Sequence, residues 1–118
     1  MTTNGIDLVL VHPGNRKRIY QDLGETLSGI EPPAWAAMMA TYVRRRGHSV
    51  VIVDPEAENL SADETAERIT SLDPVLAAIV VYGHQPSASS QNMTIAGEIC
   101  TAIKQADPSL NTAMIGGH

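Results

Sequence analysis

The sequence of 118 residues contains little cysteine, few aromatic side chains and few positive charges. Its single cysteine, Cys100, excludes a disulfide framework within the chain and a cysteine-rich zinc or iron–sulfur site. Phenylalanine is absent, so the core must be built from Val, Ile, Leu, Met and Ala. The formal net charge of -5 argues against nucleic acid as a partner, because phosphate binding requires a clustered excess of Lys and Arg.

Long apolar runs are also missing. No run approaches the roughly 20 residues that a membrane-spanning helix needs, and residues 1–5 do not resemble a signal peptide. Hydrophobic residues make up 43% of the chain and charged residues 18%, a balance typical of globular proteins. The sequence therefore predicts one domain, residues 1–118, in a cytoplasmic protein that has no membrane partner.

Four short apolar runs alternate with three helical patterns. The runs are continuous and rich in Val and Ile, which predicts strands covered on both faces, at residues 6–11, 49–53, 77–81 and 113–115. Alternating strands and helices imply right-handed crossovers and a parallel sheet. The predicted fold is α/β and doubly wound (Rossmann-like), with the flavodoxin-like strand order 2-1-3-4, because the helices are short and no dinucleotide fingerprint is present.

Each helical pattern carries start or stop signals. Pro32 and Pro33 open the first pattern and Gly47 follows its last turn. Ser61, with glutamate three residues later, forms a capping box for the second pattern. The third covers about residues 90–106 and places the only cysteine on its apolar face, as an inert core thiol. The apolar residues that recur at helical spacing in the first pattern are Trp35, Met38, Met39, Tyr42 and Val43.

Two features concern the length of the chain. The connection from Val11 to Pro32 is about twenty residues long, and loops of that length are commonly functional. The chain stops at residues 116–118, directly after the fourth predicted strand, whereas a doubly wound domain normally continues with another helix and strand. We therefore expect the amino-terminal part of a longer protein, truncated after strand 4, whose exposed edge strand would pair in a homodimer.

The ligand site of an open α/β sheet lies at the carboxyl ends of its strands, near the switch in strand order. The residues that follow the first, third and fourth predicted strands are rich in Gly, His and polar groups. Glycine lets the backbone approach a bulky ligand, and a helix N-terminus offers N–H groups to ligand oxygens. The predicted ligand-binding residues are His12, Pro13, Gly14, Asn15, Tyr82, Gly83, His84, Gln85, Ser87, Gly116, Gly117 and His118.

Three histidines in this set suggest a metal site at first sight. No pair has the close spacing of a known ligand motif, so no protein metal ligand is predicted. No catalytic residue is predicted either, because a general base at His84 or His12 would have no partner carboxylate. The chain lacks Gly-x-Gly-x-x-Gly and Walker motifs. A phospho-receiver domain would need acidic residues where His12 and Tyr82 stand.

Five short motifs occur in order over nearly the whole chain. They are Val11-His12-Pro13 after the first strand, Pro32-Pro33 at the first helix, Arg46-Gly47-His48-Ser49-Val50 entering the second strand, Val53-Asp54-Pro55-Glu56-Ala57 leaving it, and Gly116-Gly117-His118 at the end. Together they resemble the amino-terminal cobalamin-binding domain of B12-dependent radical S-adenosylmethionine (SAM) enzymes.

This resemblance implies that cobalamin lies across the carboxyl edge of the sheet, among residues 12–15, 82–87 and 116–118. It also implies a downstream radical SAM domain that holds S-adenosylmethionine and a 4Fe–4S cluster, because the Cys-x-x-x-Cys-x-x-Cys motif is missing here. The implied function is the cobalamin-binding module of a methyltransferase that acts on an unactivated carbon or phosphorus centre. The alternative is a non-enzymatic sensor or protein-interaction domain of the same topology.

The sequence departs from the usual cobalamin motif Asp-x-His-x-x-Gly. Leu10 and Asn15 stand where that motif has its Asp and Gly. We therefore expect base-off cobalamin without a protein histidine on cobalt, and His12 is the candidate if such a ligand exists. Asn is common in the family at the position of His12, and Ala34-Trp35 stands where Leu-Gly is more usual.

Overall fold

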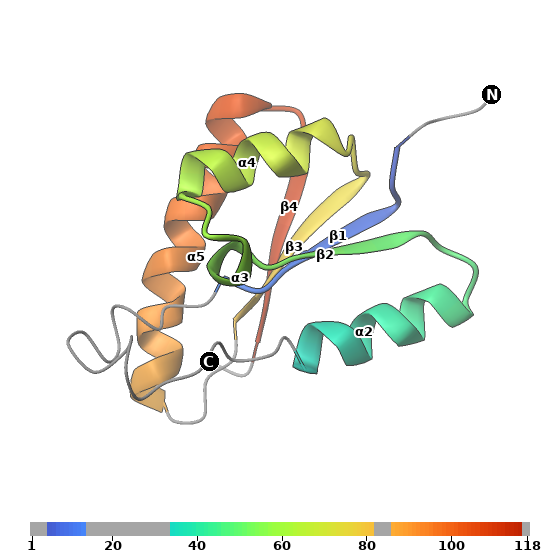
Figure 1. Cartoon of the computed structure of the whole chain (residues 1–118), viewed down its shortest axis with the longest axis horizontal. Helices are drawn as coiled ribbons and strands as arrows, with labels where there is room; N and C mark the ends of the chain where they lie inside the picture. The colour runs from blue at the N-terminus through green and yellow to red at the C-terminus, as the bar shows by residue number, and fades with distance from the viewer. Residues whose placement is uncertain (1–4, 14–33, 82–85, 117–118) are drawn as a thin grey trace.

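Four parallel strands form one sheet with helices on both faces in the computed structural model (Figure 1). The structure describes residues 5–13, 34–81 and 86–116, and of residues 86–92 it describes the backbone alone. The strands are β1 (Leu8–Val11), β2 (Val50–Val53), β3 (Leu76–Val81) and β4 (Asn111–Gly116). The helices are α2 (Ala34–Arg45), α3 (Pro55–Glu58), α4 (Ala62–Ser71) and α5 (Pro86–Ala106).

The strand order is β2-β1-β3-β4, and every neighbouring pair is parallel. Val9 is paired with Val51 on one side and with Ala77 on the other, and Ile79 is paired with Met114. The predicted α/β fold and the strand order 2-1-3-4 are therefore confirmed. The third and fourth strands begin one and two residues earlier than the sequence predicts.

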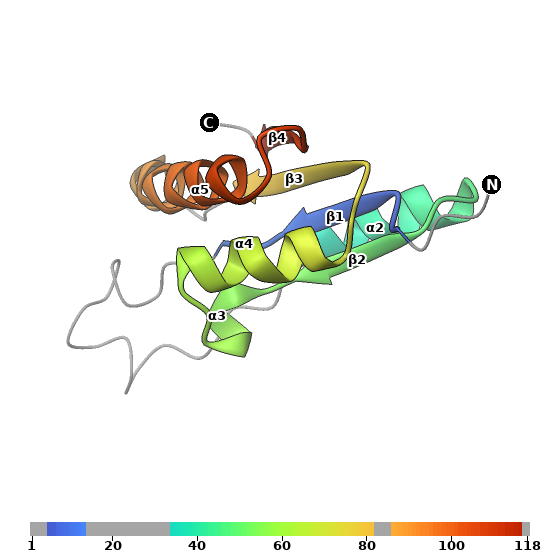
Figure 2. The ribbon, with the colours of Figure 1, turned by 90° about the horizontal axis from the view of Figure 1, so that it is seen from above.

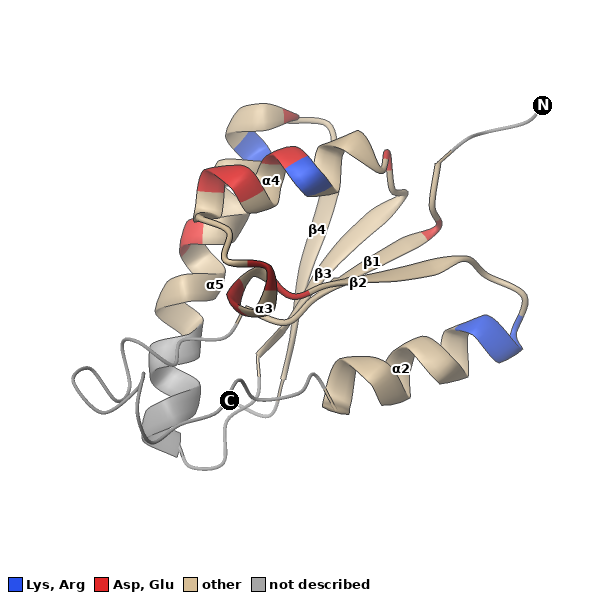
Figure 3. Ribbon diagram, viewed as in Figure 1, with Lys and Arg blue, Asp and Glu red and all other residues tan. Residues whose placement is uncertain are grey.

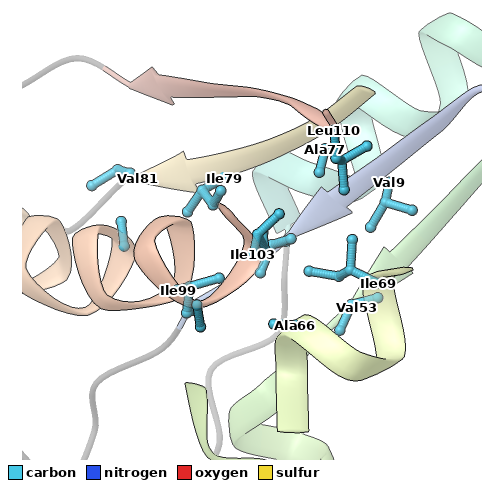
Figure 4. Close-up of a cluster of buried hydrophobic side chains, with 13 residues drawn as sticks. Val9, Val53, Ala66, Ile69, Ala77, Ile79, Val81, Ile99, Ile103 and Leu110 are labelled. Carbon is cyan, nitrogen blue, oxygen red and sulfur yellow. The ribbon is translucent and has the colours of Figure 1, made fainter. Parts of the chain in front are cut away.

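The core consists of two clusters, one on each face of the sheet, and the helices α4 and α5 lie on one face and α2 on the other (Figure 2). On one face, α4 and α5 cover Val9, Ile79 and Val81, and Ile69 and Ile103 are fully buried against these strand residues (Figure 4). On the other face, α2 covers a smaller cluster, which consists of Leu10, Ala36, Ala40, Ala78 and Val80. Burial on both faces explains why the strand sequences are continuously apolar.

Helix α2 turns its small residues toward the sheet. Ala36 and Ala40 are buried, whereas the larger Trp35, Met38 and Tyr42 are exposed. The spacing therefore predicted the helix correctly, although only Met39 and Val43 of the recurring apolar residues are partly buried. Gly47 ends the helix with φ at 92°, a left-handed conformation in which other residues are strained.

The predicted capping box of α4 is confirmed. The Ser61 hydroxyl oxygen accepts a hydrogen bond from the Glu64 backbone N–H at 3.1 Å, and the Glu64 carboxylate accepts one from the Ser61 backbone N–H at 2.9 Å. Helix α5 begins earlier than the predicted residue 90. The four-residue helix α3 was not predicted at all. Within the described residues, no helix is both long enough and apolar enough to cross a membrane.

Candidate functional site

The switch in strand order lies between β1 and β3, because the chain proceeds from β1 to one side of the sheet and then returns to the other. Ligands of such sheets bind in the crevice outside the carboxyl ends of these strands. His12 and Pro13 follow β1 directly at this edge, and β3 ends at Val81. His12 and Pro13, two of the predicted ligand-binding residues, therefore lie where the topology itself predicts a ligand.

His12 is held in place by its backbone. Its N–H donates a hydrogen bond to the Val53 carbonyl oxygen at 2.9 Å, which extends the β1–β2 ladder one residue beyond the strand. The imidazole Nε2 is buried and has no hydrogen-bond partner in the structure as described. A buried polar nitrogen without a partner costs about 1–3 kcal/mol, and native proteins contain few such groups. The His12 imidazole is therefore suited to a hydrogen bond with a ligand.

Gly116 lies at the carboxyl end of β4, in register with Val81. A Cβ atom at Gly116 would collide with the carbonyl oxygen of Val81 in the neighbouring strand. The backbones of β3 and β4 therefore require glycine at this position, whether or not a ligand is bound. Pro13 is buried at the same edge of the sheet.

Most of the other predicted site residues lie outside the described residues. Ser87 belongs to the first turn of α5, where the backbone alone is described. The structure thus brings His12, Pro13 and Gly116 to the predicted carboxyl edge of the sheet. The predicted residues that lie outside the described ranges are Gly14, Asn15, Tyr82, Gly83, His84, Gln85, Gly117 and His118.

The acidic residues that follow β2 have structural partners. The Asp54 carboxylate accepts a hydrogen bond from the Ala57 N–H at 3.1 Å and caps α3. Glu58 forms an ion pair with Arg68 of α4 at 3.1 Å. The ion pair joins α3 to α4, and the positions of Asp54 and Glu58 are thus explained without a ligand.

His48 lies at the opposite, amino edge of the sheet. Its Nδ1 is 3.5 Å from the Asp7 carboxylate, and the Ser49 N–H donates to that carboxylate at 3.0 Å. The hydrogen bond from Ser49 is the main reason why the pKa of Asp7 lies below its ordinary value, with His48 adding to the effect. The structural role predicted for His48 is consistent with this position.

Cys100 is half-buried against the larger core cluster, as its position on the apolar face of α5 predicted. Burial raises the pKa of its thiol, which keeps it in the unreactive protonated form. Among the described residues, no group of three or more His, Cys, Asp or Glu side chains is arranged to hold a metal ion.

Charge is unevenly distributed over the described surface (Figure 3). Acidic residues gather on α3 and in the first turn of α4, whereas Arg44 and Arg45 occupy the last turn of α2. Sequence reasoning did not single out the outer face of α2 as functional. The signal that could have done so is the helical spacing of Trp35, Met38 and Tyr42 opposite the small residues Ala36 and Ala40.

Comparison with known proteins relates the chain to one family and to a longer enzyme. The family model described as B12 binding domain matches residues 20–118. The anaerobic magnesium-protoporphyrin IX monomethyl ester cyclase of Rubrivivax gelatinosus is 28% identical over 112 residues, which are 94% of this chain. The chain spans only 18% of the length of that relative. No solved structure matches.

Proposed function

This chain belongs to the B12-binding domain family, and we propose that it holds cobalamin across the carboxyl edge of its sheet, at the switch point between β1 and β3. The observation that carries this proposal is the buried Nε2 of His12, which has no partner in the described structure. Cobalamin is large and fringed with amide side chains, and a neutral imidazole can donate to an amide oxygen or accept from an amide nitrogen. The edge therefore offers a polar group that suits this cofactor.

The described residues suggest a division of work at the site. His12 would bind and orient the cofactor, since the hydrogen bond from its N–H to the Val53 carbonyl oxygen holds the backbone that carries the imidazole. Pro13 and Gly116 would shape the edge. The remaining predicted contacts complete the proposed site and are Gly14, Asn15, Tyr82, Gly83, His84, Gln85, Ser87, Gly117 and His118.

We propose the base-off form of cobalamin, without a protein histidine on cobalt. The absence of the Asp-x-His-x-x-Gly pattern around His12 supports this form. In that arrangement the His12 imidazole acts as a hydrogen-bonding group toward the cofactor. When bound, cobalamin supplies a cobalt centre that carries a methyl group or reacts with a carbon centre, while the protein supplies positioning.

The chemistry of the assembled enzyme requires a second component. With one cysteine, this chain cannot hold a 4Fe–4S cluster through Cys-x-x-x-Cys-x-x-Cys. We propose a radical SAM domain, on the same polypeptide or another, that holds the cluster and S-adenosylmethionine. Methyl transfer stays the predicted reaction. The name of the Rubrivivax relative supports a second reaction class, ring closure on a tetrapyrrole substrate, and analysis of the product would distinguish the two.

Reconstitution of the purified chain with hydroxocobalamin tests the proposal. After anaerobic incubation and desalting, we expect retained corrin absorbance with a base-off spectrum. His12→Ala should weaken retention about tenfold, the equivalent of one good hydrogen bond. His12→Asn should keep much of the affinity, because the amide can also form a hydrogen bond. His48→Ala is the matched control at the opposite edge and should bind as the wild type does.

Two results would contradict parts of this proposal. Complete loss of corrin absorbance from the folded wild-type chain would overturn cobalamin binding and favour the sensor or interaction domain. Nitrogen superhyperfine splitting in the electron paramagnetic resonance spectrum of the Co(II) form, abolished in His12→Ala, would overturn the absence of a histidine ligand.

We make two further predictions, one on self-association and one on location in the cell. One is pairing of two copies through β4, which has β3 as its neighbour in the described sheet and carries no charged residue to protect its other edge. The other is a cytoplasmic location.

A further inference from the structure

The outer face of α2 carries large apolar side chains that are more than half exposed. Trp35 is 53% exposed, Met38 64% and Tyr42 61%, whereas Ala36 and Ala40 of the same helix are buried on the sheet. Small residues toward the core let the helix approach the sheet closely, and they leave the largest apolar side chains in solvent. Contiguous exposed apolar surface of this kind marks a binding surface in soluble proteins.

These residues form one continuous stripe. Trp35, Met38 and Tyr42 are spaced by three and four residues, which places them on one face of the helix. Arg46 follows four residues later, with its guanidinium carbon 4.8 Å from the centroid of the Tyr42 ring, a cation–π contact. From Trp35 to Tyr42 the stripe is about 10 Å long, at roughly 1.5 Å per residue. We call these four residues the α2 outer stripe.

The stripe begins at the functional edge of the sheet. Helix α2 leads into β2, so its first turn lies toward the carboxyl edge and its last turn toward the amino edge (Figure 1). Trp35 is therefore at the end of the helix nearer to the proposed cofactor, and Arg46 is at the far end. A domain that reaches over the carboxyl edge to meet the cofactor can extend along this stripe.

The composition of the stripe favours a protein partner. Trp, Tyr, Met and Arg are the residues enriched in protein interfaces and in their binding hot spots. A membrane surface fits less well, because α3 and α4 are acidic and the net charge of -5 would be repelled by anionic lipids (Figure 3). The positive charges of the helix are confined to one end, at residues 44–46, and none stands beside Trp35 and Met38 to anchor that part in lipid headgroups.

A second copy of the chain also fits the stripe poorly. Arg44, Arg45 and Arg46 are all exposed at one end, and residues 34–46 contain no Asp or Glu. Two stripes packed in parallel would place arginines against arginines. Two packed antiparallel would offer them a cation–π contact with Trp35 but no carboxylate. Complementary charge must therefore come from a different surface.

We propose that the α2 outer stripe docks the catalytic domain that works on the bound cobalamin. That domain, on the same polypeptide or another, presents an apolar surface to Trp35 and Met38 and a carboxylate to Arg46. The inference rests on the proposed function, because it is the cofactor at the carboxyl edge that brings the catalytic domain to this end of α2.

Site-specific crosslinking in source cells tests the docking surface with the gene product at its natural length. A photoreactive p-benzoylphenylalanine replaces Met38, and in the matched control it replaces Val75, which is equally exposed (67%) but lies outside the stripe. We expect the Met38 probe, and not the Val75 probe, to crosslink to a domain that contains Cys-x-x-x-Cys-x-x-Cys. Crosslinks only to lipid or to a second copy, equal crosslinks from both probes, or no crosslink would overturn the proposal.

Variants of the stripe give an independent measurement. In the purified complex of the two domains, Trp35→Ala should weaken docking about 30-fold, as expected for a hot-spot residue. Arg46→Glu should weaken it as well, and Val75→Ala should not. Unchanged docking in both stripe variants would contradict the inference. Cobalamin retention by the same variants is measured separately: retention without docking defects overturns the stripe alone, whereas failure of the wild type to retain cobalamin overturns the proposed function.

Discussion

Gly116 and Gly97 differ in what an added methyl group would meet. At Gly116 a Cβ atom would collide with the Val81 carbonyl oxygen, whereas at Gly97, inside α5, it would meet nothing within 4 Å. We expect Gly116→Ala to lower the free energy of unfolding by about 1–3 kcal/mol through overpacking. Gly97→Ala should raise it by roughly 0.5–1 kcal/mol, because alanine is the better helix former.

Urea unfolding followed by far-ultraviolet circular dichroism measures both variants. The pair controls itself, because the chemical change is identical and only the surroundings differ. Equal stability changes of the same sign would show that the β3–β4 contact at Gly116 is not as close as the structure has it.

At the same scale, the sequence identified positions better than it identified contacts. The place of His12 followed from the strand pattern, because any residue after a buried parallel strand lies at the carboxyl edge. That its Nε2 has no partner among the described residues could not be predicted, since a hydrogen-bond partner depends on groups brought together from distant parts of the chain. The exposure of Trp35 could not be predicted for a similar reason. Apolar spacing predicts a helix, but only the tertiary structure decides whether Ala36 or Trp35 faces the sheet.

Individual helices depend on local signals, such as capping residues, that can be recognised in the sequence. In α4 the capping box satisfies the N–H groups of Ser61 and Glu64, which have no partner within the helix. We expect Ser61→Ala to destabilise the chain by about 1 kcal/mol. Thermal and urea unfolding would measure the loss, and Ser61→Thr, which keeps the hydroxyl, should recover most of it. No loss in Ser61→Ala would mean that water replaces the cap at no cost.

A second local contact ties the start of β1 to the start of β2. The Asp7 carboxylate accepts from the Ser49 N–H, and the Ser49 hydroxyl oxygen accepts from the Asp7 N–H at 2.9 Å. The pKa of Asp7 is lowered in the folded chain, chiefly by the hydrogen bond from Ser49. A lowered folded pKa means that the ionised carboxylate stabilises the fold above its unfolded pKa of about 3.9. This contribution is lost as the pH falls through the folded value.

The difference in unfolding free energy between wild type and Asp7→Asn should therefore be largest near neutral pH and shrink below about pH 4. Denaturant titrations at a series of pH values measure it. A difference that stays constant down to pH 2 would show that the carboxylate is not held by Ser49 and His48. Asp63→Asn, in the first turn of α4, serves as a comparison from a different exposed carboxylate.

Where the element prediction failed, the cause was length. Helix α3 has four residues and is held by the Asp54 cap and the Glu58–Arg68 ion pair, contacts too few to produce a periodic pattern. The start of α5 was predicted too late for a different reason. The Ser-rich segment 87–90, taken alone, is typical of caps and turns and not of a helix interior.

For the whole molecule, the strand order followed from the sequence because few topologies obey the rules of parallel sheets. The sequence alternates strands with helices, and its strands are continuously apolar. Together with the rule of right-handed crossovers, these features exclude most other topologies and predict the doubly wound arrangement that the structure has. The site was predictable only as an edge. The residues proposed for it come from chain segments about a hundred positions apart, His12 after β1 and Gly116 at the end of β4.

This wide separation in sequence leads to a prediction about stability. The unfolded chain cannot hold His12 and the end of β4 together, so a ligand of the edge binds the folded state and stabilises it by RT ln(1 + [L]/Kd). At a free cobalamin concentration one hundred times Kd, the gain is about 2.7 kcal/mol, and Tm should rise by roughly 10 °C. Calorimetry at increasing hydroxocobalamin concentration measures the rise. The increase should be smaller in His12→Ala at the same concentration and unchanged in His48→Ala, which distinguishes binding at the carboxyl edge from binding elsewhere. A rise of equal size in His12→Ala would show that the cofactor is held without the imidazole, and the absence of any rise in the wild type would mean that the folded edge does not bind it.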